Sequence, residues 1–440
     1  MYKKFTFAQS ALLVGAALLS YQAHSAGFQL NAQSATGIGR AFAGDAVIAD
    51  NASVMARNPA AMALFDEMSL SLGFETITTE ISVTDAKYKA FATTDTVDSN
   101  YDNAGGTSVA PNIHLIVPVN DQFAWGVNLY SNFGTSTEFD DATFAGKEYG
   151  GKTEIMSVNL GLAGSYRLNE QWSFGAGLDL IYGQGTLERN TNLNISGNVC
   201  NLLENPQKRL CEALNDGNGL PVTVDETISA LSADVDGYGI GFNVGTVFEL
   251  DENNRFGLSY RYSPDIKAEG DIEYLGLPNN ELTLPLPDMA EFSGYHRLED
   301  TKFAVHYSVQ WTGWREFETL DADVSGTLNN YEWKNGFHYS IGGTYFLNRD
   351  WTLRVGYMYD ESAQDELTSV SVPDSDRQWF STGFTYHIDS KSNIDFGFTY
   401  LMGKEVKVTE ETDLGAVVST IEGTTSANAI LMGLQYSRTF

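Results

Sequence analysis

The sequence is poor in positive charge and has no long apolar run beyond its N-terminus. Its 440 residues contain 26 Lys and Arg against 57 Asp and Glu, for a formal net charge of −31. A chain this acidic repels phosphate backbones, which argues against a nucleic-acid partner. The absence of any further run of roughly 18 apolar residues argues against membrane-spanning helices. DNA-binding proteins and helical membrane proteins are therefore the first classes to set aside.

Groups that hold metals or perform covalent chemistry are also scarce. The chain has two cysteines and six histidines, and the histidines lack the spacing of metal ligands. No G-x-S-x-G motif of a serine hydrolase is present. Residues 146–153 fit the letters of a phosphate-binding loop, but an alternating segment follows where that motif requires a helix. We therefore expect no metal, no cofactor and no enzymatic activity.

The N-terminus has the pattern of a bacterial secretory signal peptide. Residues 1–25 begin with two lysines, continue through a short apolar stretch (residues 11–19) and end with small residues before Ala26. The apolar stretch is too short to act as an anchor across roughly 30 Å of membrane. Export places the chain in an oxidising compartment, where Cys200 and Cys211 can form a structural disulfide within one turn-rich segment.

From residue 69 onward, apolar side chains alternate with small or polar ones. Ile394, Phe396 and Phe398 share one face of such a segment, while Asp395 and Gly397 share the other. The same pattern recurs at residues 158–166, 172–182, 238–248, 303–311, 351–359 and 380–386. Because successive side chains of a strand point to opposite sides, this alternation predicts amphipathic strands.

The connections between these segments are unequal, and this favours a membrane barrel. Short turns that alternate with long loops are typical of bacterial outer-membrane β-barrels. A soluble β-sandwich or lectin is the alternative, although its solvent face would be richer in Lys, Glu and Thr than these Gly, Ser and Asn faces. The segments number about 13 to 16, and an even number is expected for such a barrel. The last segment ends in Phe440, which resembles an outer-membrane assembly signal, so we expect the barrel assembly machinery as a partner.

Residues 26–66 do not alternate and are instead rich in Gly and Ala. Asn58-Pro59-Ala60 imposes a rigid turn, because proline fixes φ and disfavours helix at the residue before it. The apolar content of this segment predicts burial as a plug, or hatch, inside the lumen, since a barrel of this size is too wide for side chains alone to fill. The alternative is a periplasmic tail. Residues 67–440 would then form the barrel.

Several motifs resemble the long-chain fatty acid outer-membrane transporter family (FadL). The N-terminal motifs are Ala26-Gly27-Phe28-Gln29-Leu30-Asn31, Gly37-Ile38-Gly39-Arg40-Ala41, Ile48-Ala49-Asp50 and Arg57-Asn58-Pro59-Ala60. Further motifs are Pro111-Asn112-Ile113-His114, Ser131-Asn132-Phe133-Gly134, Ser165-Tyr166-Arg167-Leu168-Asn169 and Ser293-Gly294-Tyr295. The resemblance covers nearly the whole mature chain, and it is weakest in the long loops.

The resemblance implies a monomeric all-β fold, a 14-stranded antiparallel transmembrane barrel with an N-terminal hatch in its lumen. It also implies passive transport of long-chain fatty acids from the exterior, through a loop groove and a lumenal site, to a lateral opening into the bilayer. Other hydrophobic compounds, such as aromatic hydrocarbons, are the alternative substrates. A structural or adhesive outer-membrane barrel is the alternative from another functional class.

The resemblance assigns a substrate site to three residues. Phe28 matches the family residue that touches the acyl chain, and Arg189 matches an arginine that faces the carboxylate. A buried carboxylate needs a charge-assisted donor, and a guanidinium provides two. Arg189 could instead pair with Glu188 or a loop acid. The family's second cation, a lysine, has no clear counterpart, and Lys334 is the nearest candidate.

The resemblance also assigns a hatch and a lateral gate. Its motif residues lie in the hatch turn and in a strand that the family bends to make the side opening, where glycine can interrupt a ladder. Asp360 matches a family acid near the hatch, although it could be a simple loop charge. The predicted hatch and gate residues are Asn58, Pro59, Ala60, Ser108, Ser131, Phe133, Gly134 and Asp360.

Two long extracellular loops, about residues 190–234 and 274–292, are unusually apolar. Such loops either line a substrate groove or form a small core of their own. The leucines predicted to contact substrate are Leu202, Leu203, Leu210, Leu277 and Leu284. Acidic loop residues are expected to contact outer-membrane lipid and lipopolysaccharide, bridged by divalent ions.

Overall fold

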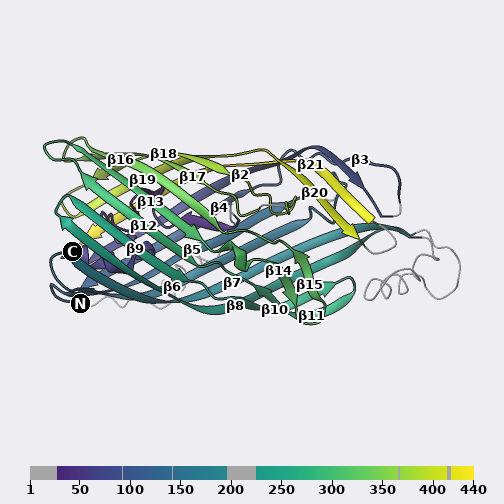
Figure 1. Cartoon of the computed structure of the whole chain (residues 1–440), viewed down its shortest axis with the longest axis horizontal. Coiled ribbons are helices and arrows are strands. Elements are labelled where there is room, and N and C mark those ends of the chain that lie inside the picture. The colour runs from purple at the N-terminus through teal and green to yellow at the C-terminus, as the bar shows by residue number, and fades with distance from the viewer. Residues whose placement is uncertain (1–26, 92, 141, 196–223, 365–366, 414–417) are drawn as a thin grey trace, which may run out of the picture.

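The computed structural model describes residues 27–91, 93–140, 142–195, 224–364, 367–413 and 418–440. Fourteen strands form one closed antiparallel barrel, in which the last strand pairs with the first (Figure 1). They are β2 (Ser69–Lys89), β4 (Thr107–Pro118), β5 (Phe123–Glu138), β6 (Lys152–Arg167), β7 (Trp172–Ile195), β8 (Val224–Asp251), β9 (Asn254–Tyr262), β12 (Met289–Arg297), β13 (Phe303–Thr312), β16 (Gly336–Phe346), β17 (Trp351–Asp360), β18 (Arg377–His387), β19 (Ser392–Gly403) and β21 (Val418–Thr439). The predicted all-β, 14-stranded barrel is confirmed. The predicted signal peptide lies outside the described residues.

At one end of the barrel, short turns that contain asparagine connect neighbouring strands (Figure 1, left). The Oδ1 atoms of Asn120, Asn169 and Asn348 each accept hydrogen bonds from the backbone N–H groups two and three residues later, at 2.8–3.0 Å. An asparagine side chain that bonds its own backbone in this way mimics a turn, so each strand can reverse within a few residues. An aromatic residue begins the strand that follows each of these turns.

The long connections at the other end fold into additional strands. These are β3 (Val97–Asp98), β10 (Ile266–Tyr274), β11 (Leu277–Leu284), β14 (Thr319–Ala322), β15 (Gly326–Asn330) and β20 (Val406–Asp413). Segment 274–292, expected as a loop, therefore contains β11 and the start of β12. Strand β10 pairs with β8, and β11 pairs with β10 and β14. The extra pairing satisfies backbone groups that a long loop would leave exposed.

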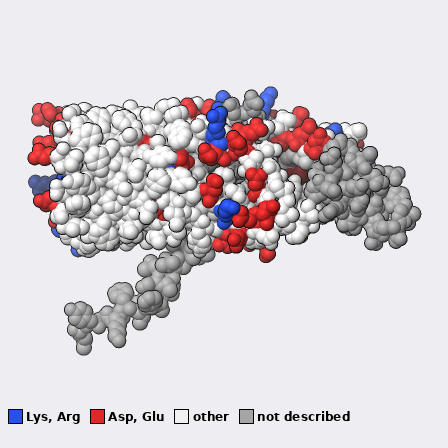
Figure 2. All heavy atoms as spheres, turned by 60° about the horizontal axis from the view of Figure 1, so that its bottom comes forward, with Lys and Arg blue, Asp and Glu red and all other residues white. Residues whose placement is uncertain are grey.

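The outer face of the barrel carries a band with few charged residues (Figure 2), and large apolar side chains are exposed on it. Leu178, Tyr238 and Ile240 are among its most exposed side chains, at 62%, 65% and 70%. Charged residues gather at the rim of short turns and over the extended strands beyond the band (Figure 2). Within the described part of the chain, no helix is long and apolar enough to cross a membrane. The band is where the strands would contact lipid.

The segment before the barrel fills the lumen. It contains β1 (Gln29–Ala32), two short helices, α2 (Ala35–Ile38) and α3 (Val54–Arg57), and the 3-10 turn η1 (Pro59–Leu64). Most of its side chains are buried, including polar ones that contact the wall. The predicted plug is therefore confirmed as a segment inside the barrel.

Glycines on the inner face of the wall let the plug approach closely. A Cβ atom at Gly356 of β17 would lie 2.2 Å from the backbone carbonyl of Arg40, and one at Gly397 of β19 would lie 2.2 Å from the carbonyl oxygen of Ala35. Neither position has room for any side chain. The glycine-rich inner faces of the sequence thus make the space that the plug occupies.

Buried ion pairs join the plug to the wall. Arg40 of the plug lies 2.6 Å from Asp45 and 2.9 Å from Asp50. Asp50 also accepts a hydrogen bond from Arg354 of β17 at 3.0 Å. Asp50 therefore bridges one guanidinium of the plug and one of the barrel.

Candidate functional site

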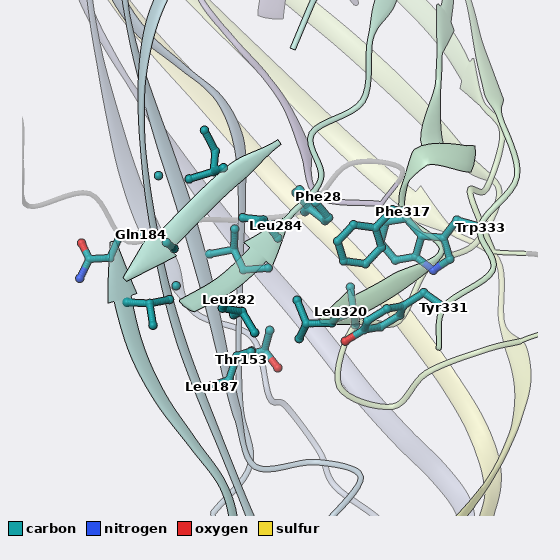
Figure 3. A pocket seen from close by; sticks show the side chains of 17 residues that line it. Phe28, Thr153, Gln184, Leu187, Leu282, Leu284, Phe317, Leu320, Tyr331 and Trp333 are labelled. Atoms are coloured by element: carbon teal, nitrogen blue, oxygen red, sulfur yellow. The ribbon is translucent and has the colours of Figure 1, made fainter. Parts of the chain in front are cut away.

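An apolar pocket of about 540 Å³ lies between the plug and the extended strands (Figure 3). Its wall combines aliphatic side chains from β7, β10 and β11 with aromatic side chains from the segment between β13 and β16. The lining residues are Phe28, Thr153, Ile155, Gly183, Gln184, Gly185, Leu187, Val235, Ile266, Ala268, Leu282, Leu284, Phe317, Leu320, Tyr331, Trp333 and Val372. Such a surface binds an apolar chain by removing it from water.

Phe28 is the contribution of the plug to this pocket, as predicted from the resemblance. Its ring meets Trp314 at a centroid distance of 4.8 Å and Phe317 at 5.1 Å, both edge-to-face. Phe133 of β5 lies 6.0 Å from the same ring, and Trp333 lies 5.8 Å from it. Aromatic pairs at these distances stabilise one another beyond their buried area. The position of the plug therefore sets the shape of one end of the pocket.

The polar groups of the pocket gather on one side. The hydroxyls of Thr153 and Tyr331 both point to that side, while the amide of Gln184 points away (Figure 3). Arg189 does not line the pocket itself. It donates a 2.5 Å hydrogen bond to Oγ1 of Thr153, which does. It also donates to the carbonyl oxygen of Glu188 at 2.8 Å. The pocket thus combines an apolar body with a polar side, and Arg189 lies next to that side without lining the pocket.

Glu410 of β20 is the acid that interacts electrostatically with Arg189. The side chain accepts a 2.5 Å hydrogen bond from the backbone N–H of Val370. Burial raises the pKa of Glu410 to about 7, against the opposing effects of that hydrogen bond and of Arg189. Arg189 stays positively charged near neutral pH, whereas the negative charge of Glu410 that opposes it changes with pH in this range.

We expect a bound carboxylate to be held more tightly at pH 6 than at pH 8. Because Glu410 loses its negative charge as the pH falls through about 7, the attraction of Arg189 for a ligand carboxylate is then less offset. The measurement is oleate affinity by titration calorimetry at several pH values. In Glu410→Gln the affinity should be almost independent of pH over this range. An unaltered pH dependence in that variant would contradict the role of Glu410.

Of the other predicted substrate residues that the structure describes, only one lines the pocket. Leu284 lines the pocket, whereas Leu277 is half-buried at the start of β11 and does not line it. The side chain of Lys334 is exposed and also lies outside the lining. Three predicted leucines (Leu202, Leu203, Leu210) and the cysteine pair (Cys200, Cys211) lie outside the described residues.

The hatch motif fastens the plug to the wall. The side chain of Asn58 accepts a 3.0 Å hydrogen bond from the backbone N–H of Ala60, which caps η1. Its Nδ2 donates to the carbonyl oxygens of Ala46, at 3.0 Å, and of Thr246 on β8, at 3.1 Å. Pro59 begins η1, where a residue without an N–H group is well accommodated.

Strand β5 leaves the barrel ladder in the stretch where a bend is predicted. Its pairing with β6 is interrupted between Tyr130 and Gly134, and its pairing with β4 runs no further than Leu129. Over this stretch β5 pairs instead with β1 of the plug. Ser131 is buried at this contact, and the N–H of Gly134 donates a 2.7 Å hydrogen bond to the carbonyl of Phe28. The plug thus covers the inner side of an interruption in the wall.

The last two predicted gate residues lie on different strands. Ser108 is buried on β4, in the stretch that has no ladder pairing with β5. Asp360 is fully buried at the end of β17, with its Oδ1 3.1 Å from Nε2 of His338. Its Oδ2 accepts a 3.3 Å hydrogen bond from Trp379, whose ring contacts Phe42 of the plug. Asp360 is therefore a buried residue close to the plug, not a loop charge.

Sequence reasoning missed the aromatic side of the pocket. Trp314, Phe317, Tyr331 and Trp333 come from the segment between β13 and β16, which has no long alternating run. The signal that could have found them is their density, because four large aromatic residues within twenty positions of a segment that does not alternate indicate a buried cluster.

Comparison with known proteins gives a consistent assignment. A family model described as outer membrane protein transport protein (OMPP1/FadL/TodX) matches residues 16–440. A long-chain fatty acid transport protein of Escherichia coli O6:H1 is 37% identical over the full length of both chains. That of Escherichia coli K12 is 36% identical, over 93% of this chain and 95% of its own. Outer membrane protein P1 of Haemophilus influenzae is 34% identical, again over the full length of both.

Solved structures share the fold at lower identity. A FadL homologue of Pseudomonas aeruginosa superposes with a TM-score of 0.80 at 22% identity, over 94% of this chain and 100% of its own. The toluene transporter TodX of Pseudomonas putida superposes with a TM-score of 0.64 at 20% identity, over 89% and 94%. These likenesses support the barrel architecture.

Proposed function

Because this chain belongs to the FadL/TodX family of outer-membrane transport proteins, we propose that it takes up long-chain fatty acids. Membership makes it a bacterial outer-membrane β-barrel that transports hydrophobic compounds and is not an enzyme. The proposal concerns which hydrophobic compound is carried. Its relatives at 36–37% identity are named for long-chain fatty acid transport.

The observation that carries the proposal is the polarity of the pocket. A fatty acid has an apolar chain and one carboxylate, and the pocket has an apolar body and one polar side with Arg189 behind it. The guanidinium is held by backbone oxygens and by Thr153, so it is fixed before a ligand arrives. A preorganised donor of this kind favours a charged head group over none.

Aromatic hydrocarbons are the second candidate substrates. The aromatic rings on one side of the pocket, including Phe317 and Trp333, could stack on a flat ligand. Lys334 is exposed, and neither it nor Arg189 is among the residues that line the pocket. An uncharged substrate would need neither cation. A barrel with only a structural or adhesive role would bind neither class of compound.

We propose that substrate leaves sideways, where β5 departs from the ladder. For a ligand in the pocket to reach the interruption between β4 and β5, β1 must release its contacts with Ser131 and Gly134. Ser108 would line the exit, and the hatch motif at Asn58 would act as the fixed point about which the plug moves. Contacts with lipopolysaccharide and with the assembly machinery remain predictions, as does the monomeric state.

Replacement of Arg189 by alanine tests the choice of substrate. A hydrogen bond to a charged group contributes about 1.5–3 kcal/mol, so we expect oleate to bind roughly ten to a hundred times more weakly. Hexadecane, which has no head group, should bind as before. The measurement is equilibrium binding of both radiolabelled ligands to purified protein, with mass spectrometry of co-purified lipids.

Two matched variants serve as controls. Arg315→Ala removes an exposed arginine next to Trp314 and should change neither affinity. Lys334→Ala tests the candidate second cation, and we expect a smaller effect than at Arg189. An equal loss of oleate and hexadecane in Arg189→Ala would remove the residue from the head-group role. Toluene binding without oleate binding in the native protein would favour the second candidate.

A further inference from the structure

The apolar pocket has two hydroxyl groups in its lining, and they lie on one side of it. They belong to Thr153 of β6 and to Tyr331, whereas the amide of Gln184 points away from the pocket (Figure 3). Among the described residues that line the pocket, none carries a charge. A ligand that enters the pocket therefore meets a hydroxyl group, and not a charged side chain, at its polar side.

Arg189 determines which way the hydroxyl of Thr153 points. The oxygen of Thr153 accepts the 2.5 Å hydrogen bond from Arg189, so its own hydrogen must point elsewhere. Thr153 is 1% exposed, and within the described part of the chain its hydrogen has no acceptor. The buried indole N–H of Trp333, another lining residue, is also without a partner there. Because buried donors are almost always paired, these groups indicate that the pocket accommodates an oxygen acceptor.

The guanidinium of Arg189 is largely occupied by the protein itself. Its Nη1 donates to the carbonyl oxygens of Lys152 at 2.6 Å and of Glu188 at 2.8 Å, and its Nη2 donates to Thr153. Three of its five N–H donors are thus used. Hydrogen bonds in a chain polarise one another, so a cation that donates to Thr153 makes the hydroxyl of Thr153 a stronger donor. Arg189 can therefore act on a ligand through Thr153.

An acid offsets part of the positive charge beside this hydroxyl. Glu410 interacts electrostatically with Arg189, and it does not line the pocket. A guanidinium that faced the ligand alone would select strongly for a charged head group. A single hydroxyl next to a cation and an acid can instead donate to a neutral oxygen as well as to a carboxylate.

We infer that the hydroxyl of Thr153, oriented by Arg189, binds the head-group oxygen of the substrate, and that the pocket accepts long-chain alcohols as well as long-chain acids. The inference rests on the proposed uptake of fatty acids and names the donor and the substrate class of the same pocket. Arg189 is then a positioning residue, whose charge also favours a carboxylate. Acids should bind more tightly than alcohols, and alcohols more tightly than alkanes of similar length.

Thr153→Val tests the inference, because valine keeps nearly the same shape and lacks the hydroxyl. The measurement is equilibrium binding of oleate, oleyl alcohol and hexadecane to the purified protein. We expect oleate to bind about tenfold more weakly and oleyl alcohol about threefold more weakly, the values of a charged and a neutral hydrogen bond. Hexadecane should bind as before. Thr153→Ser keeps a hydroxyl and should bind all three ligands as the native protein does.

Thr191→Val is the matched control, because Thr191 is a buried threonine of β7 that does not line the pocket. Its affinity for the three ligands should equal that of the native protein. Unchanged binding of oleate and oleyl alcohol in Thr153→Val, or an equal loss of all three ligands, would overturn the role of Thr153. A native protein that binds oleate but not oleyl alcohol would overturn the wider substrate class. Absence of oleate binding by the native protein would instead overturn the proposed function.

Discussion

A single added methyl group in Gly356→Ala is expected to displace the plug and open the barrel to small solutes. The new Cβ would lie 2.2 Å from the carbonyl carbon and oxygen of Arg40. Both are backbone atoms, so no side chain can rotate away to relieve the contact. Overpacking of a well-filled interior costs about 1–3 kcal/mol, and a backbone contact belongs at the upper end. Single-channel conductance and uptake of a hydrophilic antibiotic should both rise.

Gly343→Ala is the matched control for this prediction. Gly343 lies on the neighbouring strand β16, and a Cβ there would meet its nearest atom, the carbonyl oxygen of Ala304, at 3.7 Å. That is an ordinary contact, so the plug should stay in place and conductance should stay low. Normal conductance in both variants would show that the plug can shift along the wall without opening a path for solutes.

Arg40→Met is also expected to loosen the plug strongly, because it removes a buried positive charge that pairs with two acids. Arg40 is the shared partner of Asp45 and Asp50, at 2.6 and 2.9 Å. Methionine keeps the length of the side chain but leaves Asp45 without this cation and leaves Asp50 with Arg354 alone. Removal of one member of a buried ion pair costs about 3–5 kcal/mol. The plug should become sensitive to protease and to hydrogen exchange while the barrel itself stays folded.

The comparison for this variant is an exposed ion pair. Lys267 lies 2.9 Å from Glu281 on the extended strands, and both residues are accessible to solvent. Lys267→Met should leave plug and barrel unchanged, because exposed pairs contribute little. If the plug of Arg40→Met resisted protease and hydrogen exchange as well as the plug of the native protein, the ion pairs of Arg40 would not be what holds the plug in place.

The barrel could be predicted from the sequence because the alternation of inward-facing and outward-facing residues can be seen within each strand. In β19, Asp395 and Gly397 face inward while Ile394 and Tyr400 are exposed, which is the alternation read from the residues themselves. Each strand carries this information independently of the others. The same rule explains why segment 274–292 reads as a loop, since within β11 only Leu282 and Leu284 follow the alternation.

The pocket could be predicted only in part, because its walls meet through distant parts of the chain. Phe28 and Leu284 were found, the first through a resemblance and the second through its apolar neighbours. The contacts of Phe28 with Trp314 and Phe317 join residues almost three hundred positions apart, and no periodic pattern encodes such a meeting. The hydrogen bond from Arg189 to Thr153 joins adjacent strands and depends on their register.

The pairing of β1 with β5 has a consequence for how the protein is made. Strand β1, the first that the structure describes, pairs with a strand that begins about ninety residues later. In hydrocarbon, each unpaired backbone group costs several kcal/mol. The wall at β5 therefore cannot reach its final state until the N-terminus has entered the lumen. We therefore expect a barrel without its plug to present an unpaired strand edge at β5, of the kind that promotes pairing with another chain.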